Sequence, residues 1–310
     1  RLQVTTGTKY AIAVVNGTAA LHLCLHLCGV EKDDEVLVPA LAFVAAANAV
    51  SYCNAVPHFV DCEEKTLGVD PTGLESYLQQ TSEIKHGECF NKSSGRRIKA
   101  LIVVHTFGHP VDLDAVSSVC RRFKLELVED AAESLGSTYK GGHTGCWGKV
   151  AALSFNGNKI ITTGGGGAIL TQDEGLARQA KHLSTTAKQP HPWRYFHDAK
   201  GYNYRLPNIN AALGCAQLEQ LSGFVQQKRE LSTRYKNEFD NCSGIKFYQE
   251  PEFARSNYWL NALILDEECS HHLEAILNLC NKEGVMTRPA WLAPSMTGVP
   301  GAPWSTPISG

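Results

Sequence analysis

Val128-Glu129-Asp130-Ala131-Ala132-Glu133 closes an apolar run that begins at Leu125, and apolar runs of similar length recur between longer helical patterns from Glu35 to Gln172. Strands covered on both faces by crossover helices have this pattern, so the sequence predicts an α/β sheet. The acid at the carboxyl end of such a strand lies at the sheet edge where these folds bind ligands. Asp130 is therefore a candidate site residue.

Further strands and helices are expected on both sides of this stretch. The apolar pattern that starts at Thr18 predicts a helix from Gly17 to Cys28, with Gly29 placed to end it. A second helix is expected from Val111 to Phe123. The predicted strands are Glu35 to Pro39, Val56 to Val60, Ala100 to His105, Leu125 to Glu129, Val150 to Phe155 and Ala168 to Thr171.

The pattern changes after Thr171 to long helical stretches, and this change indicates a second unit. We place the boundary near residue 220, with a large domain over 1–220 and a small C-terminal domain over 221–310. The elements expected near and beyond it are helices at Asn208 to Leu221, Gly223 to Phe239 and Ser270 to Lys282, and strands at Ile245 to Tyr248, Tyr258 to Leu265 and Val285 to Arg288.

Composition excludes several classes of protein. The formal net charge of −2 gives no electrostatic footprint for nucleic acid, and no stretch approaches the roughly 20 apolar residues of a membrane span. The chain has 11 cysteines, an odd number, and no two of them form a CxxC pair. Both features favour reduced thiols in a cytoplasmic protein over a disulfide framework.

A lysine follows the next strand in a position where it could carry chemistry. The stretch Ser154-Phe155-Asn156-Gly157-Asn158-Lys159 leads into the glycine run Gly164 to Gly167. Pyridoxal phosphate (PLP) enzymes need an amine for a Schiff base and a carboxylate that keeps the pyridine nitrogen protonated. Lys159 and Asp130 are placed for these two roles, although a lone lysine before a turn is more often a surface residue.

A candidate phosphate site lies upstream, at Asn16-Gly17-Thr18-Ala19-Ala20-Leu21. Backbone N–H groups at a helix N-terminus bind anions, and the Thr18 hydroxyl adds a donor. Taken alone, the stretch also fits an ordinary helix cap.

Four stretches together resemble the DegT/DnrJ/EryC1/StrS sugar aminotransferases. They are Asn16 to Leu21, Glu129 to Glu133, Ser154 to Lys159 and Gly201-Tyr202-Asn203-Tyr204-Arg205, in the family's order. The resemblance implies the aspartate-aminotransferase-like fold (fold type I), PLP as cofactor, and a mixed sheet flanked by helices plus a smaller C-terminal α/β domain.

The resemblance also assigns residues around the cofactor ring. Lys159 would be the Schiff-base lysine and proton shuttle, and Asp130 would pair with the pyridine nitrogen. Phe43 would stack on the ring, although one aromatic in an apolar run is usually a core residue. Glu133 occupies the position near the 3′-oxygen where many members have Gln.

The phosphate contacts implied by the resemblance come from two chains. Gly17, Thr18 and Ser154 would bind the phosphate from the same chain, while Asn203 would reach the phosphate of a partner across a homodimer interface. Taken singly, Ser154 could cap a turn and Asn203 could be a turn residue.

The activity implied is transfer of an amino group, by resemblance from glutamate, to the C4 keto group of a nucleotide-linked 4-keto-6-deoxy sugar. His105 to Pro110, Ser154 to Gly167 and Thr185 to Lys188 resemble the subfamily of the nonulosonic (legionaminic) acid pathway, whose substrate is a UDP-N-acetylhexosamine derivative. Two regions depart from the family: a segment expected before Arg1 is missing, and Leu292 to Gly310 does not match.

Other interpretations are less well supported by the residues. His22 and His26 lie beside Cys24 and Cys28, but the helical period separates the two pairs, so we expect a buried helix and no metal site. The contiguous glycines at Gly164 do not fit a dinucleotide loop. Lys159 argues against the related dehydratases, which have His at that position. A non-catalytic PLP-binding or regulatory protein of the same fold remains as an alternative.

Overall fold

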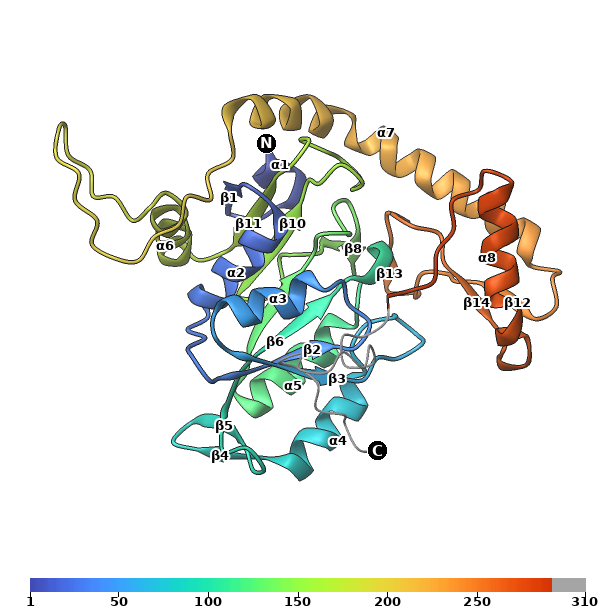
Figure 1. Ribbon diagram of the computed structural model, residues 1–310, viewed down its shortest axis with the longest axis horizontal. Coiled ribbons are helices and arrows are strands. Elements are labelled where there is room, and N and C mark those ends of the chain that lie inside the picture. Colours follow the sequence, from blue (N-terminus) through green and yellow to red (C-terminus); the bar gives the residue numbers. More distant parts are fainter. Residues whose placement is uncertain (292–310) are drawn as a thin grey trace.

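A mixed sheet forms the centre of the computed structural model, which describes residues 1–291 of the chain (Figure 1). Its strand order is β1-β11-β10-β7-β6-β2-β3, with the hairpin β4–β5 joined to β6. The strands are β1 (Tyr10–Val14), β2 (Glu35–Pro39), β3 (Val56–Val60), β4 (Ser82–Lys85), β5 (Glu88–Asn91), β6 (Arg97–Val104), β7 (Glu126–Asp130), β10 (Val150–Ser154) and β11 (Gly167–Thr171).

Five adjacent strands run parallel, from β10 through β7, β6 and β2 to β3, while β11 pairs antiparallel with both β10 and β1. The six strands predicted for the first half of the chain are all present, with ends shifted by three residues at most. Because the parallel strands end on the same side of the sheet, Val104, Asp130 and Ser154 meet at one edge.

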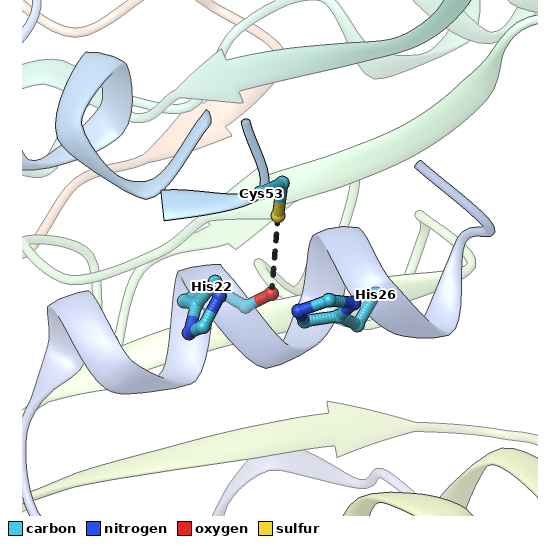
Figure 2. A group of neighbouring side chains, drawn as sticks. All are labelled: His22, His26 and Cys53. Carbon is cyan, nitrogen blue, oxygen red and sulfur yellow. Dashed lines mark hydrogen bonds between the residues drawn. The ribbon is translucent and has the colours of Figure 1, made fainter. Parts of the chain in front are cut away.

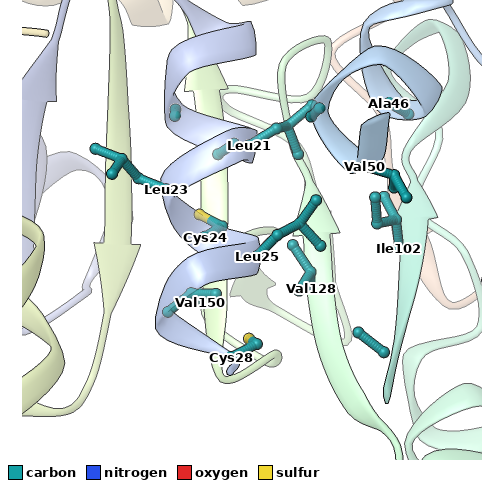
Figure 3. Close-up of a cluster of buried hydrophobic side chains, with 14 of the residues drawn as sticks. Leu21, Leu23, Cys24, Leu25, Cys28, Ala46, Val50, Ile102, Val128 and Val150 are labelled. Carbon is teal, nitrogen blue, oxygen red and sulfur yellow. The ribbon is translucent and has the colours of Figure 1, made fainter. Parts of the chain in front are cut away.

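Helices cover both faces of the sheet, so the strands are buried on both sides. One face packs against α2 (Gly17–Leu27), α3 (Ala45–Tyr52) and α6 (Glu174–Ser184), and the other against α4 (Pro71–Thr81) and α5 (Leu113–Phe123). Side chains alternate between the two faces: Ile102 belongs to the first layer and Leu101 to the second. Figure 3 shows the first layer, where α2 packs its leucines against α3 and the strands.

The helix α7 (Asn208–Phe239) leads from the large body to a smaller unit (Figure 1). That unit contains β12 (Ile245–Phe247), β14 (Leu263–Leu265), the 3-10 helix η2 (Glu267–His272) and α8 (Leu273–Lys282). We predicted two helices, Asn208 to Leu221 and Gly223 to Phe239, where α7 is one continuous helix. Nothing lies within 4 Å of a Cβ at Gly223, so this glycine is simply an exposed position in the helix.

Two strand predictions in the smaller unit were wrong. Residues 285–288 are not a strand, and the strand expected from Tyr258 begins only at Leu263. Tyr258 has a left-handed backbone (φ 48°), which an apolar pattern does not reveal. The domain boundary near residue 220 stays a prediction and falls within α7, while the departure expected after Leu292 lies outside the described residues.

Short elements complete the described chain: α1 (Leu2–Thr6), η1 (Thr106–Gly108), and a small sheet of β8 (Thr138–Tyr139), β9 (Gly142–His143) and β13 (Ala254–Arg255). Between α6 and α7 the chain projects away from the body as a long arm (Figure 1). Within residues 1–291, no helix has both the length and the apolar character needed to cross a membrane.

Candidate active site

A cavity of about 300 Å³ lies where the carboxyl ends of β6, β7 and β10 meet the N-terminus of α2. Residues from the large body and from the last part of the described chain enclose it together. Its lining comprises Asn16, Gly17, Thr18, Leu21, Phe43, Ala45, Val104, Asp130, Ala132, Glu133, Ser154, Asn156, Asn158, Lys159, Trp259, Arg288 and Trp291. The cavity therefore gathers every predicted site residue except Asn203.

The start of α2 forms one wall, and its backbone is arranged for an anion. Asn16 caps the helix, accepting a hydrogen bond from the Ala19 N–H at 2.7 Å through its side chain. The N–H groups of Gly17 and Thr18 belong to the first turn, which has no intrahelical acceptors, so they can donate into the cavity. Helix geometry and cavity lining thus place the predicted phosphate donors together.

Glycine at position 17 is required by the close approach of β10. A Cβ added to Gly17 would lie 2.8 Å from the Ser154 Cβ and 3.1 Å from its Oγ, which is closer than side chains tolerate. The missing side chain brings the Ser154 hydroxyl next to the first turn of α2. Ser154 can therefore add a hydroxyl donor to the same anion site as the backbone of Gly17 and Thr18.

Lys159 follows β10 in a turn that directs its amine into the cavity. The Lys159 N–H donates to the Asn156 carbonyl at 3.0 Å, and the side chain is only 12% exposed. Its Nζ lies 3.4 Å from Glu133 Oε1 and 4.1 Å from the centre of the Trp259 ring. The amine is thus held inside the site by a carboxylate and an aromatic face, unlike a surface lysine.

Asp130 is the last residue of β7 and is 7% exposed. Burial raises the pKa of its carboxyl group, while the hydrogen bond from the Ala132 N–H to Oδ1 (3.1 Å) and the charge of Lys159 act in the opposite direction. A buried carboxylate gains from a cationic partner more than an exposed one does. The site therefore favours a protonated heterocyclic nitrogen beside Asp130.

Glu133 lies between Lys159 and the backbone of η1. Its Oε2 accepts a hydrogen bond from the Phe107 N–H at 2.8 Å, and its side chain is 5% exposed. Burial raises the pKa of Glu133 to about 7, although Lys159 and the Phe107 N–H both lower it. Near neutral pH this carboxyl group can therefore be either a proton donor or an acceptor.

The remaining predicted residues have different positions. Phe43 lines the cavity, is 52% exposed, and has its ring 5.7 Å from the ring of Trp291. Asn203 lies outside the cavity and is exposed at a bridge to Thr185, where its Oδ1 accepts hydrogen bonds from the Arg205 guanidinium. Within a single chain, Asn203 does not complete the site.

The lining residues that the sequence did not predict include Trp259, Arg288 and Trp291. Trp259 is 3% exposed, and its Nε1–H donates to the Asn158 carbonyl at 2.6 Å, next to Lys159. These residues lie about 100 or more positions after Lys159 in the chain. No local spacing connects them to the lysine, so only the fold could have revealed their place.

A buried contact between a histidine and a glutamate supports the strand that carries Asp130. His105 Nε2 lies 3.0 Å from Glu129 Oε2, and both side chains are fully buried. Glu129 also accepts backbone hydrogen bonds from Gly145, Trp147 and Gly148 at 2.6 to 2.7 Å. These bonds more than offset the desolvation of the carboxylate, so the pKa of Glu129 is lowered. The end of β7 is thereby fixed beside the cavity.

The donor set fits PLP on observations of this chain alone. At the start of α2, Gly17 packs closely against Ser154, and this arrangement suits a phosphate. Buried Asp130 suits a protonated pyridine nitrogen. Lys159 supplies the amine that the aldehyde requires. Phe43 offers an aromatic face at the same cavity.

Comparison with curated proteins supports the same chemistry. EpsN of Bacillus subtilis (strain 168), whose name describes a pyridoxal phosphate-dependent aminotransferase, is 40% identical over 291 residues, covering 94% of this chain and 72% of EpsN. The GDP-perosamine synthase of Escherichia coli O157:H7 is 36% identical over 270 residues, covering 86% of this chain and 69% of the synthase.

Solved structures agree on the fold. The aminotransferase TlmJ from Streptoalloteichus hindustanus superposes with a TM-score of 0.84 at 28% identity, covering 96% of this chain and 77% of TlmJ. The PLP form of Spr1654 from Streptococcus pneumoniae, named as a sugar aminotransferase, has a TM-score of 0.83 at 25% identity and covers 94% and 76%. The chain therefore has the aspartate-aminotransferase-like fold (fold type I) of PLP-dependent transferases, as predicted.

The match to a protein family extends over almost the whole chain, from residue 1 to residue 300. It includes all four stretches from which the resemblance was drawn. The chain belongs to the DegT/DnrJ/EryC1/StrS aminotransferase family, whose members use pyridoxal phosphate.

Proposed function

We propose that this chain transfers an amino group from an amino acid, glutamate, to the C4 keto group of a nucleotide-linked 4-keto-6-deoxy sugar. The observation that carries the proposal is the meeting of Lys159, Asp130 and the Gly17–Ser154 anion site in one cavity. The names of two similar proteins, a GDP-perosamine synthase and a sugar aminotransferase, support a sugar as the acceptor. The non-catalytic alternative is not favoured, because the family match and the placed amine both indicate catalysis.

Bound PLP supplies an electron sink that makes the α-proton of the amino donor acidic. The Lys159 amine would accept this proton and deliver it to the carbon that carries the new amino group, since a positioned amine can act as both base and acid. The Asp130 carboxylate would hold a proton on the ring nitrogen. Both groups are buried, so neither would exchange protons freely with bulk water.

Five further residues would bind and orient the cofactor. The Gly17 and Thr18 backbone and the Thr18 and Ser154 hydroxyls would hold the phosphate, and the exposed face of Phe43 would pack on the ring. Glu133, with its pKa raised to about 7, would donate or accept a hydrogen bond at the phenolic oxygen. These contacts would leave the Lys159 amine free to move between reaction partners.

We also propose a homodimer with shared active sites. Asn203 does not line the cavity of its own chain, and the arm before it carries three exposed aromatic side chains, Trp193 (76%), Tyr195 (80%) and Phe196 (63%). Aromatic residues exposed on a projecting segment are characteristic of a protein interface. A two-fold contact would place each Asn203 at the partner's phosphate.

For the sugar itself we propose a UDP-N-acetylhexosamine derivative of the legionaminic acid pathway. The support is the likeness of the stretches at His105, Ser154 and Thr185 to that subfamily. The 11 cysteines are all free in the structure, which suits the cytoplasm, where the nucleotide sugars and glutamate would be available.

The substrate proposal is tested by incubating the protein with glutamate and a panel of UDP-, GDP- and TDP-linked 4-keto sugars. Mass spectrometry should show the mass change of keto-to-amine conversion with the UDP-N-acetyl sugar, in the wild type and not in Lys159→Ala. Amination of only the GDP- or TDP-linked sugars would overturn the UDP assignment. No amination of any sugar by a protein that binds PLP would overturn the acceptor class.

A further inference from the structure

A cluster of metal-ligating side chains lies on α2, about one helical turn beyond the anion site (Figure 2). His22 and His26 are four residues apart, so they lie on the same side of the helix. Cys53, which ends α3, faces them. One ring nitrogen from each histidine and the cysteine sulfur all lie within 4.8 Å of one another.

The third ligand comes from an element that sequence spacing does not connect to the histidines. Cys24 and Cys28, the neighbouring cysteines, are buried in the core layer between α2 and the sheet. Cys53 lies 27 residues after His26 and reaches the histidines only because α3 packs against α2. The sequence argument about a metal site considered only Cys24 and Cys28 beside the two histidines, and it did not include Cys53.

The surroundings of the cluster hold the two rings in place. His22 is 3% exposed and Cys53 is 6% exposed. The Tyr204 hydroxyl lies 3.2 Å from His22 Nδ1, and the Tyr202 hydroxyl lies 2.9 Å from His26 Nε2. Among the described residues, nothing hydrogen-bonds to the buried His22 Nε2. Buried ring nitrogens nearly always have a partner, so this one indicates a missing ligand.

We propose that His22, His26 and Cys53 bind a zinc ion, at a site separate from the PLP cavity. Two imidazoles and one thiolate are a zinc ligand set, and a water would complete four-coordination. On binding, the Cys53 S–H bond breaks, a zinc–sulfur bond forms, and one proton is released to solvent. Zinc–ligand distances of about 2.0 to 2.3 Å require the donors to close by roughly 1 Å, within reach of side-chain rotation.

The zinc site would connect two parts of the chain that we propose bind PLP. Tyr202 and Tyr204 contact the metal ligands, and Asn203 lies between them in sequence. The helix that carries the histidines begins at Gly17 in the anion site. Residues that contact metal ligands become fixed with them. Zinc would therefore fix residues 202–204 against α2.

The test uses full-length, PLP-loaded protein stripped with a chelator and then titrated with Co²⁺, whose thiolate complex has a charge-transfer band in the near ultraviolet. We expect one Co²⁺ per chain with this band, displacement by Zn²⁺, and release of one proton. Cys53→Ala should abolish the band, and His26→Gln should weaken Co²⁺ binding by more than about 10-fold. Cys24→Ala, from the same helix, should leave both unchanged.

The PLP absorbance and the far-ultraviolet circular dichroism of each variant report whether it is folded. If Cys53→Ala does not fold, the partly exposed His26→Gln carries the test. The proposal is overturned if the folded wild type binds no Co²⁺ or Zn²⁺ stoichiometrically. It is equally overturned if the thiolate band persists in the folded Cys53 variant, or if the folded His26 variant binds Co²⁺ as tightly as the wild type.

Discussion

Asp130 and Glu133 are three residues apart, yet their surroundings prepare them for different tasks. Both are buried, but Asp130 keeps a hydrogen bond from Ala132 N–H, and Glu133 contacts the Lys159 amine and the Phe107 N–H. A carboxylate beside a protonated ring nitrogen must stay charged, whereas one beside a phenolic oxygen works best near its pKa. The pKa of Glu133, raised to about 7, fits the second task.

Substitution of Asp130 by Asn tests its electrostatic role. Asn keeps the size and can still accept from the Ala132 N–H, but it has no charge with which to hold the ring proton. We expect PLP binding to survive and the glutamate half-reaction to slow by about 100-fold or more, as when a preorganised charge is removed. Single-turnover absorbance measures the rate. Glu126→Gln, at the other end of β7, is the control, and a parent-like rate in Asp130→Asn would refute the role.

Glu133 predicts a pH dependence of stability in cofactor-free protein. Between its usual pKa of 4.5 and about 7, the unfolded chain has lost the Glu133 proton while the folded chain keeps it. The folded state then binds more protons, so rising pH lowers the stability that this residue contributes. Glu133→Gln cannot ionise, so its unfolding free energy should gain about 3 kcal/mol relative to wild type between pH 4.5 and 8.

Urea unfolding of both proteins at several pH values measures this difference. Glu274→Gln, on the exposed side of α8, serves as the control and should show a difference that does not vary with pH. A flat difference for Glu133→Gln would mean that Glu133 ionises normally in the folded chain.

At the scale of elements, the start of α2 depends on one missing side chain. Gly17→Ala would put a Cβ 2.8 Å from the Ser154 Cβ, so α2 or β10 must shift. Overpacking of this kind costs about 1 to 3 kcal/mol, and here the shift falls on the phosphate donors. We expect PLP affinity to fall by about 10-fold or more in an absorbance titration.

Gly223→Ala provides the matched control in α7, where a Cβ meets nothing within 4 Å. It should leave PLP affinity unchanged and raise stability by about 0.5 to 1 kcal/mol, because Ala is the better helix former. Equal PLP affinity in both alanine variants would show that the close approach at Gly17 is not needed for the phosphate.

The buried strands and the residues that follow them were predictable because both are local features of the chain. Apolar runs located β2, β3, β6, β7, β10 and β11. Asp130 is the last residue of β7 and Lys159 lies in the turn after β10, so both could be found from the predicted strand ends. Trp259 was not predictable, because it reaches Lys159 only through the packing of the smaller unit. The edge strand β1 (Tyr10–Val14) was missed, and it is placed in the sheet by its pairing with the distant β11, which no local pattern reveals.

At the scale of the whole molecule, the segment between α6 and α7 carries Asn203, which does not line the cavity of its own chain. If Asn203 serves the partner's phosphate, two defective chains can form one intact site. Lys159→Ala and Asn203→Asp should each be inactive, the latter because its added negative charge lies near a phosphate. In a mixed dimer, one site takes its lysine from the second variant and its asparagine from the first.

Mixing these variants, with subunit exchange shown by native mass spectrometry, should therefore restore activity. One site in each mixed dimer would be intact, which is about one quarter of all sites at random exchange. Two variants that remain inactive after demonstrated exchange would contradict the shared site. Each variant alone, taken through the same exchange procedure, is the control.

The central claim is that the Lys159 amine holds PLP covalently. Reducing the PLP-loaded protein with borohydride and mapping its peptides by mass spectrometry tests this directly. We predict a phosphopyridoxyl group on Nζ of Lys159, and none anywhere in Lys159→Ala treated in the same way. A phosphopyridoxyl group found on another lysine of the wild type, with Lys159 unmodified, would contradict the claim.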